Sequence, residues 1–147
     1  MESVKWKRLR DAAKLPQYKT EGAACMDIYC ALDGKYEYDY LYPSETKVFK
    51  TGFAVQIPEG YELQIRCRSG YAASGILLSN GVGTIDCDYR GEVGIILTNT
   101  SPNTFKISTG DRIAQCLLVP VEKFEFMPVS ELDTTERGEG GYGSTGR

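Results

Sequence analysis

Residues 53–66 read FAVQIPEGYELQIR, and this stretch decides the fold class. Phe53–Ile57 is apolar except for one glutamine. Tyr61–Arg66 alternates apolar and polar side chains, a period of two that is typical of a strand with one buried face. Between these runs, Pro58–Gly60 is a turn sequence, because proline and glycine supply the backbone angles that a reversal needs. The stretch therefore predicts two short β-strands joined by a turn.

The same pattern continues through the rest of the chain. Short apolar or alternating runs recur roughly every 8–12 residues, separated by Gly, Pro, Asn or Asp. Tyr36–Tyr42 has a tyrosine at every second position, which predicts a half-buried strand, and Val93–Leu97 is continuously apolar, which predicts a strand buried on both faces. Ile113–Val121 and Phe124–Phe126 predict the last core strands.

Signals for helices are few. Ser69–Ser74 and Val129–Leu132 each fit one helical turn at most. A chain of 147 residues corresponds to about one domain, large enough to bury roughly 70% of its unfolded surface, and no internal repeat divides it. Many short strands with little helix predict an all-β fold, either a closed barrel or a jelly-roll sandwich.

Composition excludes several kinds of chemistry. The chain contains no histidine, which rules out Ser-His and Cys-His nucleophilic pairs, histidine-ligated zinc and a histidine general base. A proton must therefore be taken by a carboxylate, a lysine, a tyrosine or a thiolate. The net charge of −3 argues against nucleic acid as the main partner, although individual arginines can still hold the phosphates of a small molecule.

The cysteines and the N-terminus bear on the compartment. The five cysteines are odd in number and form no C-x-x-C pair, and Met1–Arg10 is charged, without the apolar run of a signal peptide. No stretch is long and apolar enough to predict a membrane span. We therefore expect reduced thiols in a cytoplasmic protein (in the host cytoplasm or nucleus if the gene is viral), with no membrane partner.

The C-terminal residues 137–147 read RGEGGYGSTGR and contain five of the 16 glycines. Such a segment has too little apolar surface to offset the entropy cost of ordering, so we expect a body of residues 1–136 and a mobile tail of residues 137–147. A merely disordered end would explain only the glycines. A functional tail would also explain the arginine, tyrosine, serine and threonine between them, which supply a phosphate partner, a stacking ring and two hydroxyl groups.

Two short segments combine charge with turn residues. Arg66–Gly70 (RCRSG) ends a predicted strand and precedes the first helical turn, where an arginine, a hydroxyl and free N–H groups fit either an anion site or a solvated turn. Gly110–Gln115 (GDRIAQ) begins another strand, and its Asp111 and Arg112 fit a turn and a surface charge.

Gly81–Glu92 (GVGTIDCDYRGE) carries more chemistry. Its glycines permit a tight hairpin and close approach of the backbone to a ligand. Asp86 and Asp88 are two residues apart and would share one face of a strand, where they could form a base or a metal site. Aspartates in such a position are also common turn residues, so the pattern alone leaves both interpretations open.

Considered in order along the chain, five segments resemble the motifs of the homotrimeric dUTPase family, and the resemblance covers essentially the whole length. They are Gly22–Tyr29 (GAACMDIY), Arg68–Ala72 (RSGYA), Asn80–Gly91 (NGVGTIDCDYRG), Gly110–Gln115 (GDRIAQ) and Arg137–Gly146 (RGEGGYGSTG).

This resemblance implies a dUTP diphosphatase, which converts dUTP and water to dUMP and pyrophosphate with Mg²⁺, keeping uracil out of DNA and supplying dUMP for thymidylate synthesis. It implies a jelly-roll-like distorted β-barrel with at most one or two helical turns and a flexible glycine-rich tail. It also implies a homotrimer with three shared sites. One chain supplies the first, second and fourth motifs, another chain the third motif, and the remaining chain the fifth.

The resemblance also assigns roles. Asp86 matches the general base that activates water, and Asp27 matches the aspartate that reaches Mg²⁺ through bound water. Substrate contacts are implied for Arg68, Ser69, Gly70 and Gln115 on the phosphates, and for Arg137, Gly143, Ser144 and Thr145 from the tail. Recognition of uracil and deoxyribose is implied for Asn80, Thr84, Ile85, Tyr89 and Gly94, and for Tyr142, which stands where the family usually has a stacking phenylalanine.

Two alternative functions fit parts of the same pattern. A dCTP deaminase-type relative shares the fold but uses a glutamate after an R-S-S-type motif and usually lacks the glycine-rich fifth motif. A non-catalytic nucleotide-binding regulatory protein would be favoured by the loss of a motif, yet Asp27, Asp86, Gln115 and Arg137 are all present. Cys67 and Tyr71 depart from the usual proline and leucine, and neither change removes a polar role.

Overall fold

The structure is a computed structural model that describes residues 2–143. Ser144 and Thr145, to which substrate contacts were assigned, lie outside the described residues. The elements are β1 (Lys5–Arg8), β2 (Met26–Tyr29), β3 (Tyr38–Leu41), β4 (Thr46–Gln56), β5 (Tyr61–Arg66), α1 (Ser69–Ala73), β6 (Ile76–Leu78), β7 (Gly83–Ile85), β8 (Glu92–Asn99), β9 (Phe105–Ser108) and β10 (Arg112–Pro120).

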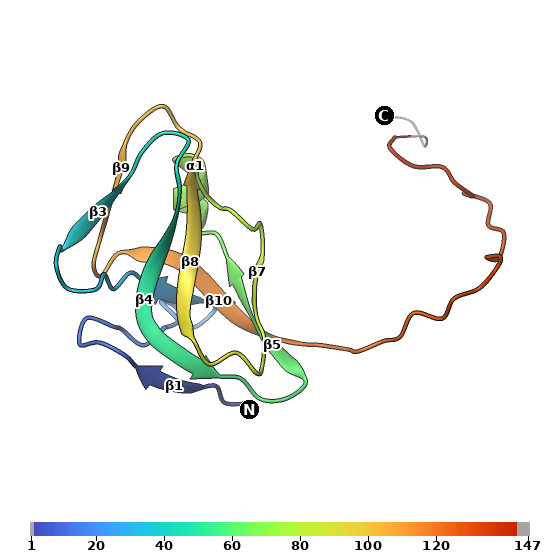
Figure 1. Cartoon of the computed structure of the whole chain (residues 1–147), viewed down its shortest axis with the longest axis horizontal. Helices are drawn as coiled ribbons and strands as arrows, with labels where there is room; N and C mark the ends of the chain where they lie inside the picture. Colours follow the sequence, from blue (N-terminus) through green and yellow to red (C-terminus); the bar gives the residue numbers. More distant parts are fainter. Residues whose placement is uncertain (1, 144–147) are drawn as a thin grey trace.

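The strands form two four-stranded sheets with a small third one beside them (Figure 1). The strand order is β1-β4-β8-β6 in the first sheet and β2-β10-β5-β7 in the second, while β3 pairs with β9, and every pair is antiparallel. The four-stranded sheets keep open edges and do not close by pairing. The prediction of an all-β, jelly-roll-like fold is confirmed.

The turn at Pro58–Gly60 explains why residues 53–66 matter so much for the fold. Gly60 adopts φ +81°, a left-handed backbone that favours glycine, and the N–H of Tyr61 donates to the carbonyl of Pro58 at 3.3 Å. The two predicted strands are present as the end of β4 and the whole of β5. They do not pair with each other, because the turn carries the chain from the first sheet to the second.

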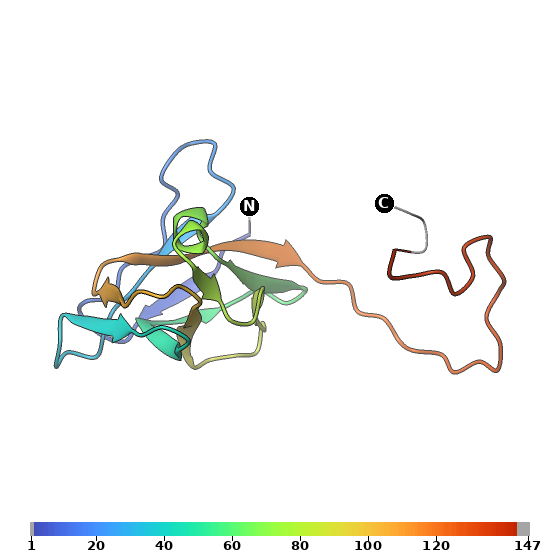
Figure 2. The ribbon, with the colours of Figure 1, turned by 90° about the horizontal axis from the view of Figure 1, so that it is seen from above.

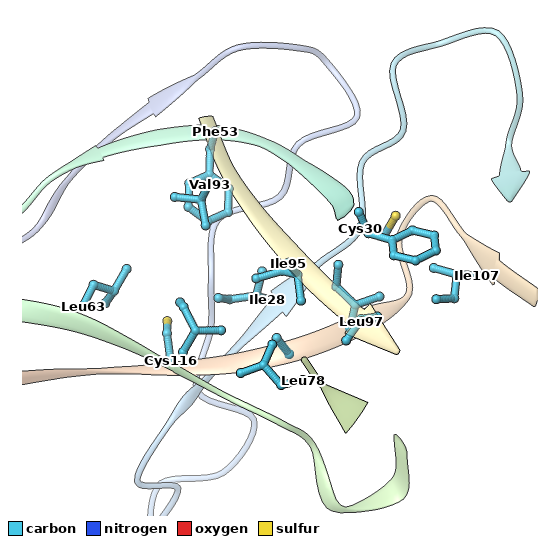
Figure 3. Close-up of a cluster of buried hydrophobic side chains, with 14 of the residues drawn as sticks. Ile28, Cys30, Phe53, Leu63, Leu78, Val93, Ile95, Leu97, Ile107 and Cys116 are labelled. Carbon is cyan, nitrogen blue, oxygen red and sulfur yellow. The ribbon is translucent and has the colours of Figure 1, made fainter. Parts of the chain in front are cut away.

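The hydrophobic core lies between the two large sheets (Figure 3). Phe53, Val93 and Ile95 enter it from the first sheet, and Ile28 and Leu63 enter it from the second. Burying one such side chain stabilises the fold by about 1.5–3 kcal/mol. The two sheets are therefore held together by side chains from widely separated parts of the sequence.

All five cysteines are free, as predicted. Cys30 and Cys116 are buried in the core, and burial raises the pKa of both thiols to about 12. These two thiols therefore remain protonated near neutral pH. Separately, no helix among residues 2–143 is long and apolar enough to span a membrane.

The structure corrects one strand prediction about burial and shows which face of a second, half-buried strand is covered. Val93–Leu97 lies in β8, which alternates between buried and half-buried side chains, so only one of its faces is covered by the core. In β3, Tyr38 and Tyr40 point outward and are exposed, whereas Leu41 is fully buried. The alternation of tyrosines marked the strand correctly, but the tyrosines form its outer face.

The C-terminal end also differs from expectation. The last strand ends at Pro120, and Phe124 and Phe126 lie in no strand, with 75% and 90% of their surface exposed. No helical turn forms at Val129–Leu132, whereas the one predicted near Ser69 is present as α1. Figure 2 shows the chain after β10 running away from the sheets. The two rings pack only edge-to-face on each other, with centroids 5.2 Å apart, and both stay largely exposed to solvent.

Candidate functional site

A slot opens where the edge of the first sheet approaches the edge of the second. Its volume is about 240 Å³. Six residues to which the sequence assigned a role line it: Asn80, Thr84, Ile85, Asp86, Tyr89 and Gly94. The remaining lining residues are Ile65, Leu78, Gly83, Glu92 and Ile96. Sites for whole drug-sized ligands are roughly 300–1,000 Å³, so this slot suits a single ring system better than a complete nucleotide.

The backbone of β7 gives the slot its polar wall. Residues Gly83–Ile85 pair with β5 on one side only, and no other strand of the described chain pairs with the opposite side. That free edge presents main-chain N–H and C=O groups to a ligand. The predicted hairpin within Gly81–Glu92 is not formed as a strand pair, because β7 belongs to the second sheet and β8 to the first.

The loop after β7 carries Asp86 and Tyr89. The N–H of Tyr89 donates to the carbonyl of Asp86 at 3.1 Å, and the Tyr89 hydroxyl donates to the carbonyl of Glu92 at 3.0 Å. The phenol folds over Gly91, where a Cβ atom would collide with the ring. Gly91 is therefore needed for this compact loop, and Asp86 is left exposed at the mouth of the slot.

Glu92 ties the far end of this loop to the rest of the chain, a role that the sequence did not reveal. Its carboxylate accepts two hydrogen bonds from the Arg10 guanidinium, at 2.6 and 2.9 Å, and one from the N–H of Gly52 at 2.8 Å. Burial alone would raise the pKa of Glu92, but the hydrogen bonds from Arg10 and Gly52, together with the charges of Arg10 and Lys50, lower it below its ordinary value. The Glu92 carboxylate is therefore ionised at neutral pH.

A second group of predicted residues surrounds Asp27 in β2. The two oxygens of this buried carboxylate contact Arg68 Nε at 3.2 Å and Arg112 Nη1 at 3.0 Å. Arg68 also donates to the carbonyl of Arg112 at 3.0 Å. Arg112 was interpreted from the sequence as a surface charge, and its contact with Asp27 instead makes it part of this group, whose two guanidinium groups outnumber the single carboxylate.

Three further phosphate-contact candidates lie next to this group. Ser69 and Gly70 form the exposed first turn of α1 directly after Arg68. Gln115 lies opposite Asp27 in the register of β10 and β2, and its side chain donates to the carbonyl of Cys67 at 2.9 Å. The structure therefore brings the first, second and fourth motifs together at one end of the second sheet.

The donor groups near Asp27 limit how a divalent cation could bind. Both carboxylate oxygens of Asp27 are already engaged by arginines, and no group of three or more metal-ligating side chains exists among residues 2–143. Mg²⁺ keeps several waters and is usually held by one or two carboxylates together with substrate phosphates. The residues present therefore fit Mg²⁺ that arrives with a phosphate ligand and reaches Asp27 through water.

The tail residues lie apart from both groups. The Arg137 side chain donates to the carbonyl of Gly140 at 2.8 Å, within the tail itself, and Tyr142 is fully exposed. Gly143 has φ +89° and touches nothing that would obstruct a side chain. One chain thus holds the predicted residues in three places (the slot, the group around Asp27 and the tail), and none of the residues that line the slot belongs to the other two.

The fold and these groups define a class of protein: a jelly-roll-like protein with a ring-sized slot beside a carboxylate and a separate arginine-rich group suited to phosphates. The family model for dUTPase matches residues 11–146. The chain belongs to the dUTPase family.

Individual relatives and structures agree with this assignment. Deoxyuridine 5′-triphosphate nucleotidohydrolase of Zymomonas mobilis is 50% identical over 143 residues, covering 95% of this chain and 94% of that protein. The Anaplasma marginale protein of the same name is 47% identical, covering 90% and 88%. Staphylococcus bacteriophage 80alpha dUTPase with dUPNHPP has a TM-score of 0.87 at 30% identity, with full coverage of both chains. A mutant dUTPase of phage phi11, described with a structural Mg(II) ion, has a TM-score of 0.78 at 27% identity, covering 90% and 99%.

Proposed function

We propose that this chain hydrolyses dUTP to dUMP and pyrophosphate, with the slot holding the nucleoside. The observation that carries the proposal is the lining of the slot, which places Asp86 at the mouth of a ring-sized pocket edged by free main-chain groups of β7. Uracil offers O4 and N3–H, which such an edge can pair. Thymine adds a methyl group and cytosine presents an amino group to the wrong partner, so both leave the slot mismatched.

Tyr89 favours deoxyribose over ribose. Its ring lines the slot, and it is fixed by folding over Gly91 and by the hydrogen bond to the Glu92 carbonyl. A flat ring held in this way beneath the sugar leaves little room for a 2′-hydroxyl. Tyr89 therefore acts as the contact that discriminates dUTP from UTP.

Asp86 acts on the attacking water. A carboxylate is a weak base, so Asp86 works mainly by orienting the water toward the α-phosphorus and accepting its proton late. The leaving group is pyrophosphate, and the water oxygen stays with dUMP.

The group around Asp27 serves the triphosphate. Arg68 and the first turn of α1, with Ser69 and Gly70, face the phosphates, and Gln115 lies beside them. Asp27 would hold Mg²⁺ through bound water, and the ion would neutralise part of the triphosphate charge. Arg137 and the tail then close over the outer phosphate through charge-assisted hydrogen bonds.

A nucleotide panel tests this function. Pyrophosphate release from dUTP is expected to exceed release from dTTP, dCTP and UTP by at least about 100-fold in kcat/KM, because each competitor leaves polar groups unpaired or clashes with the slot. Chelating Mg²⁺ is expected to lower the rate on dUTP at least about tenfold. Equal rates on all four nucleotides would refute recognition by the slot, and ammonia release from dCTP would point instead to a deaminase-type relative.

We infer further that the active unit is a homotrimer, because the site is incomplete in one chain. Asp86, the group around Asp27 and the tail lie in three separate places, although all three must meet one nucleotide. A ring of identical chains with head-to-tail interfaces brings different surfaces of neighbouring copies together at each interface. A threefold arrangement lets one copy contribute each part.

The segment after β10 supports this assembly. Phe124, Phe126 and Met127 are exposed, while an apolar groove of about 570 Å³ lies beside the edge strand β1. Trp6 lines this groove, and its Nε1–H is buried with no acceptor in the described chain. The segment 121–136 has five acidic residues and one basic, whereas residues 1–10 have four basic and one acidic. A strand added to β1 by the segment of a second copy would bury the rings and offer carbonyl groups to Trp6.

The mass of the protein in solution tests the assembly. We expect three chains for the native protein, and a smaller species with little activity when Phe124 and Phe126 are both replaced by serine, because the variant removes apolar surface that only a second copy can cover. Tyr36→Ser removes another exposed aromatic ring, just before β3, and this variant is expected to remain trimeric. A native protein that sediments as a monomer and is fully active would rule the trimer out.

A further inference from the structure

Arg10 joins three parts of the chain that are distant in sequence. Besides its two hydrogen bonds to Glu92, its Nη1 donates to the carbonyl of Ala31 at 2.8 Å. Gly52 lies against it with φ +73°, and a Cβ there would approach Arg10 Cγ to 2.9 Å and the Ala13 Cβ to 2.8 Å. The N–H of the same glycine donates to Glu92. Backbone and side chain thus enclose the ion pair in a fixed geometry.

This ion pair is the side-chain tether of the loop that carries Asp86 and Tyr89. Within residues 86–91, the side-chain hydrogen bonds of the described chain go only to the loop itself and to the Glu92 carbonyl: Tyr89 bonds that carbonyl, and Arg90 bonds the carbonyls of Cys87 and Tyr89. Glu92, at the start of β8, is the first residue of this stretch whose side chain bonds another part of the chain.

We propose that Arg10 is a positioning residue for the nucleoside slot, acting through Glu92. This inference rests on the proposed function of the slot. Glu92 and Gly94 line the slot from β8, and the Glu92 carbonyl receives the hydroxyl of Tyr89. Holding the Glu92 carboxylate therefore fixes the start of β8, its carbonyl and the tyrosine that depends on it.

The expected consequence falls mainly on nucleoside binding. Tyr89 and Gly94 are both within three residues of Glu92, whereas Asp86 lies six residues away, at the end of a separate strand. A shift at Glu92 thus moves the contacts to deoxyribose and uracil more than it moves the Asp86 carboxylate that activates water. Loss of the tether should raise KM more than it lowers kcat, and it should weaken the preference for dUTP over UTP.

The test compares Arg10→Met and Arg10→Lys with the native trimer, well below the lowest melting temperature. For Arg10→Met we expect KM for dUTP to rise about tenfold with kcat within about twofold, and the dUTP-to-UTP ratio of kcat/KM to fall about tenfold. Arg10→Lys keeps the charge but loses the bidentate contact, so its KM should lie between the KM of the native protein and that of Arg10→Met. Adding Glu92→Gln to Arg10→Met should change KM little further, because both act through one contact.

Lys47→Met is the matched control. It breaks the contact between Lys47 and Asp39, an ion pair of 2.8 Å that joins β4 to β3 and lines no part of the slot, so KM and the UTP ratio should stay native. If Arg10→Met lowers the melting temperature but leaves KM and the ratio native, the pair is merely structural and the inference is wrong. Should Arg10→Met fail to fold, Arg10→Lys provides the test. A raised KM and a weaker affinity for an imido analogue of dUTP in that variant would support the inference, and native values would refute it. A native trimer that does not turn over dUTP would instead overturn the proposed function.

Discussion

Asp86→Asn is expected to lower kcat for dUTP at least about 1,000-fold while the affinity for a non-hydrolysable dUTP analogue stays within about threefold. The amide has nearly the same shape as the carboxylate, so the slot keeps its form, but it cannot accept the proton of the attacking water. Single-turnover rates and equilibrium binding measure the two effects separately.

Asp88→Asn is the matched control for this variant. Asp88 is two residues further along the same loop, is also exposed, and does not line the slot, so the control should retain most of kcat. An Asp86→Asn enzyme with native kcat would exclude Asp86 as the base. Labelled oxygen from the solvent should appear in dUMP. Its appearance in pyrophosphate would mean that water attacks the β-phosphorus instead.

The sequence predicts those parts of this structure that depend on local patterns. The strand β5, the turn at Pro58–Gly60 and the single turn of α1 follow from side-chain periodicity and from residues that fix backbone angles. The residues of the slot could be named because one segment, residues 80–94, supplies most of its polar lining, so that a contiguous motif maps onto one place in the fold.

Features that depend on distant partners could not be predicted in this way. Arg10 and Glu92 are 82 residues apart, and no periodicity connects them. The alternation at Phe124–Phe126 suits a strand, but a local pattern does not specify whether the covering surface belongs to the same chain or to another copy. In β3, a period of two defines two faces, and the fully buried Leu41 determines which of them faces the core.

The second large effect that we expect is a loss of kcat/KM when the tail, residues 137–147, is removed. A chain that ends at Glu136 should keep its melting temperature, because the hydrogen bonds of residues 137–143 in the described structure stay within the segment 135–140. Its kcat/KM should fall about 100-fold, since the phosphate contacts of Arg137 and the ring of Tyr142 are lost. Arg137→Ala should reproduce part of the loss, and a truncated enzyme with native kcat/KM would show that the tail has no catalytic part.

The truncated chain also shows whether the active site is shared between chains. It retains Asp86 and lacks the tail, whereas the Asp86→Asn chain lacks the base and retains the tail. If one site takes the two parts from different chains, unfolding both proteins together and refolding them as mixed trimers should restore activity. With equal amounts and random assembly, about a quarter of the sites receive both functional parts. If each chain builds its own site, every mixed trimer stays as inactive as its components, and the homotrimer would then be an assembly of independent sites.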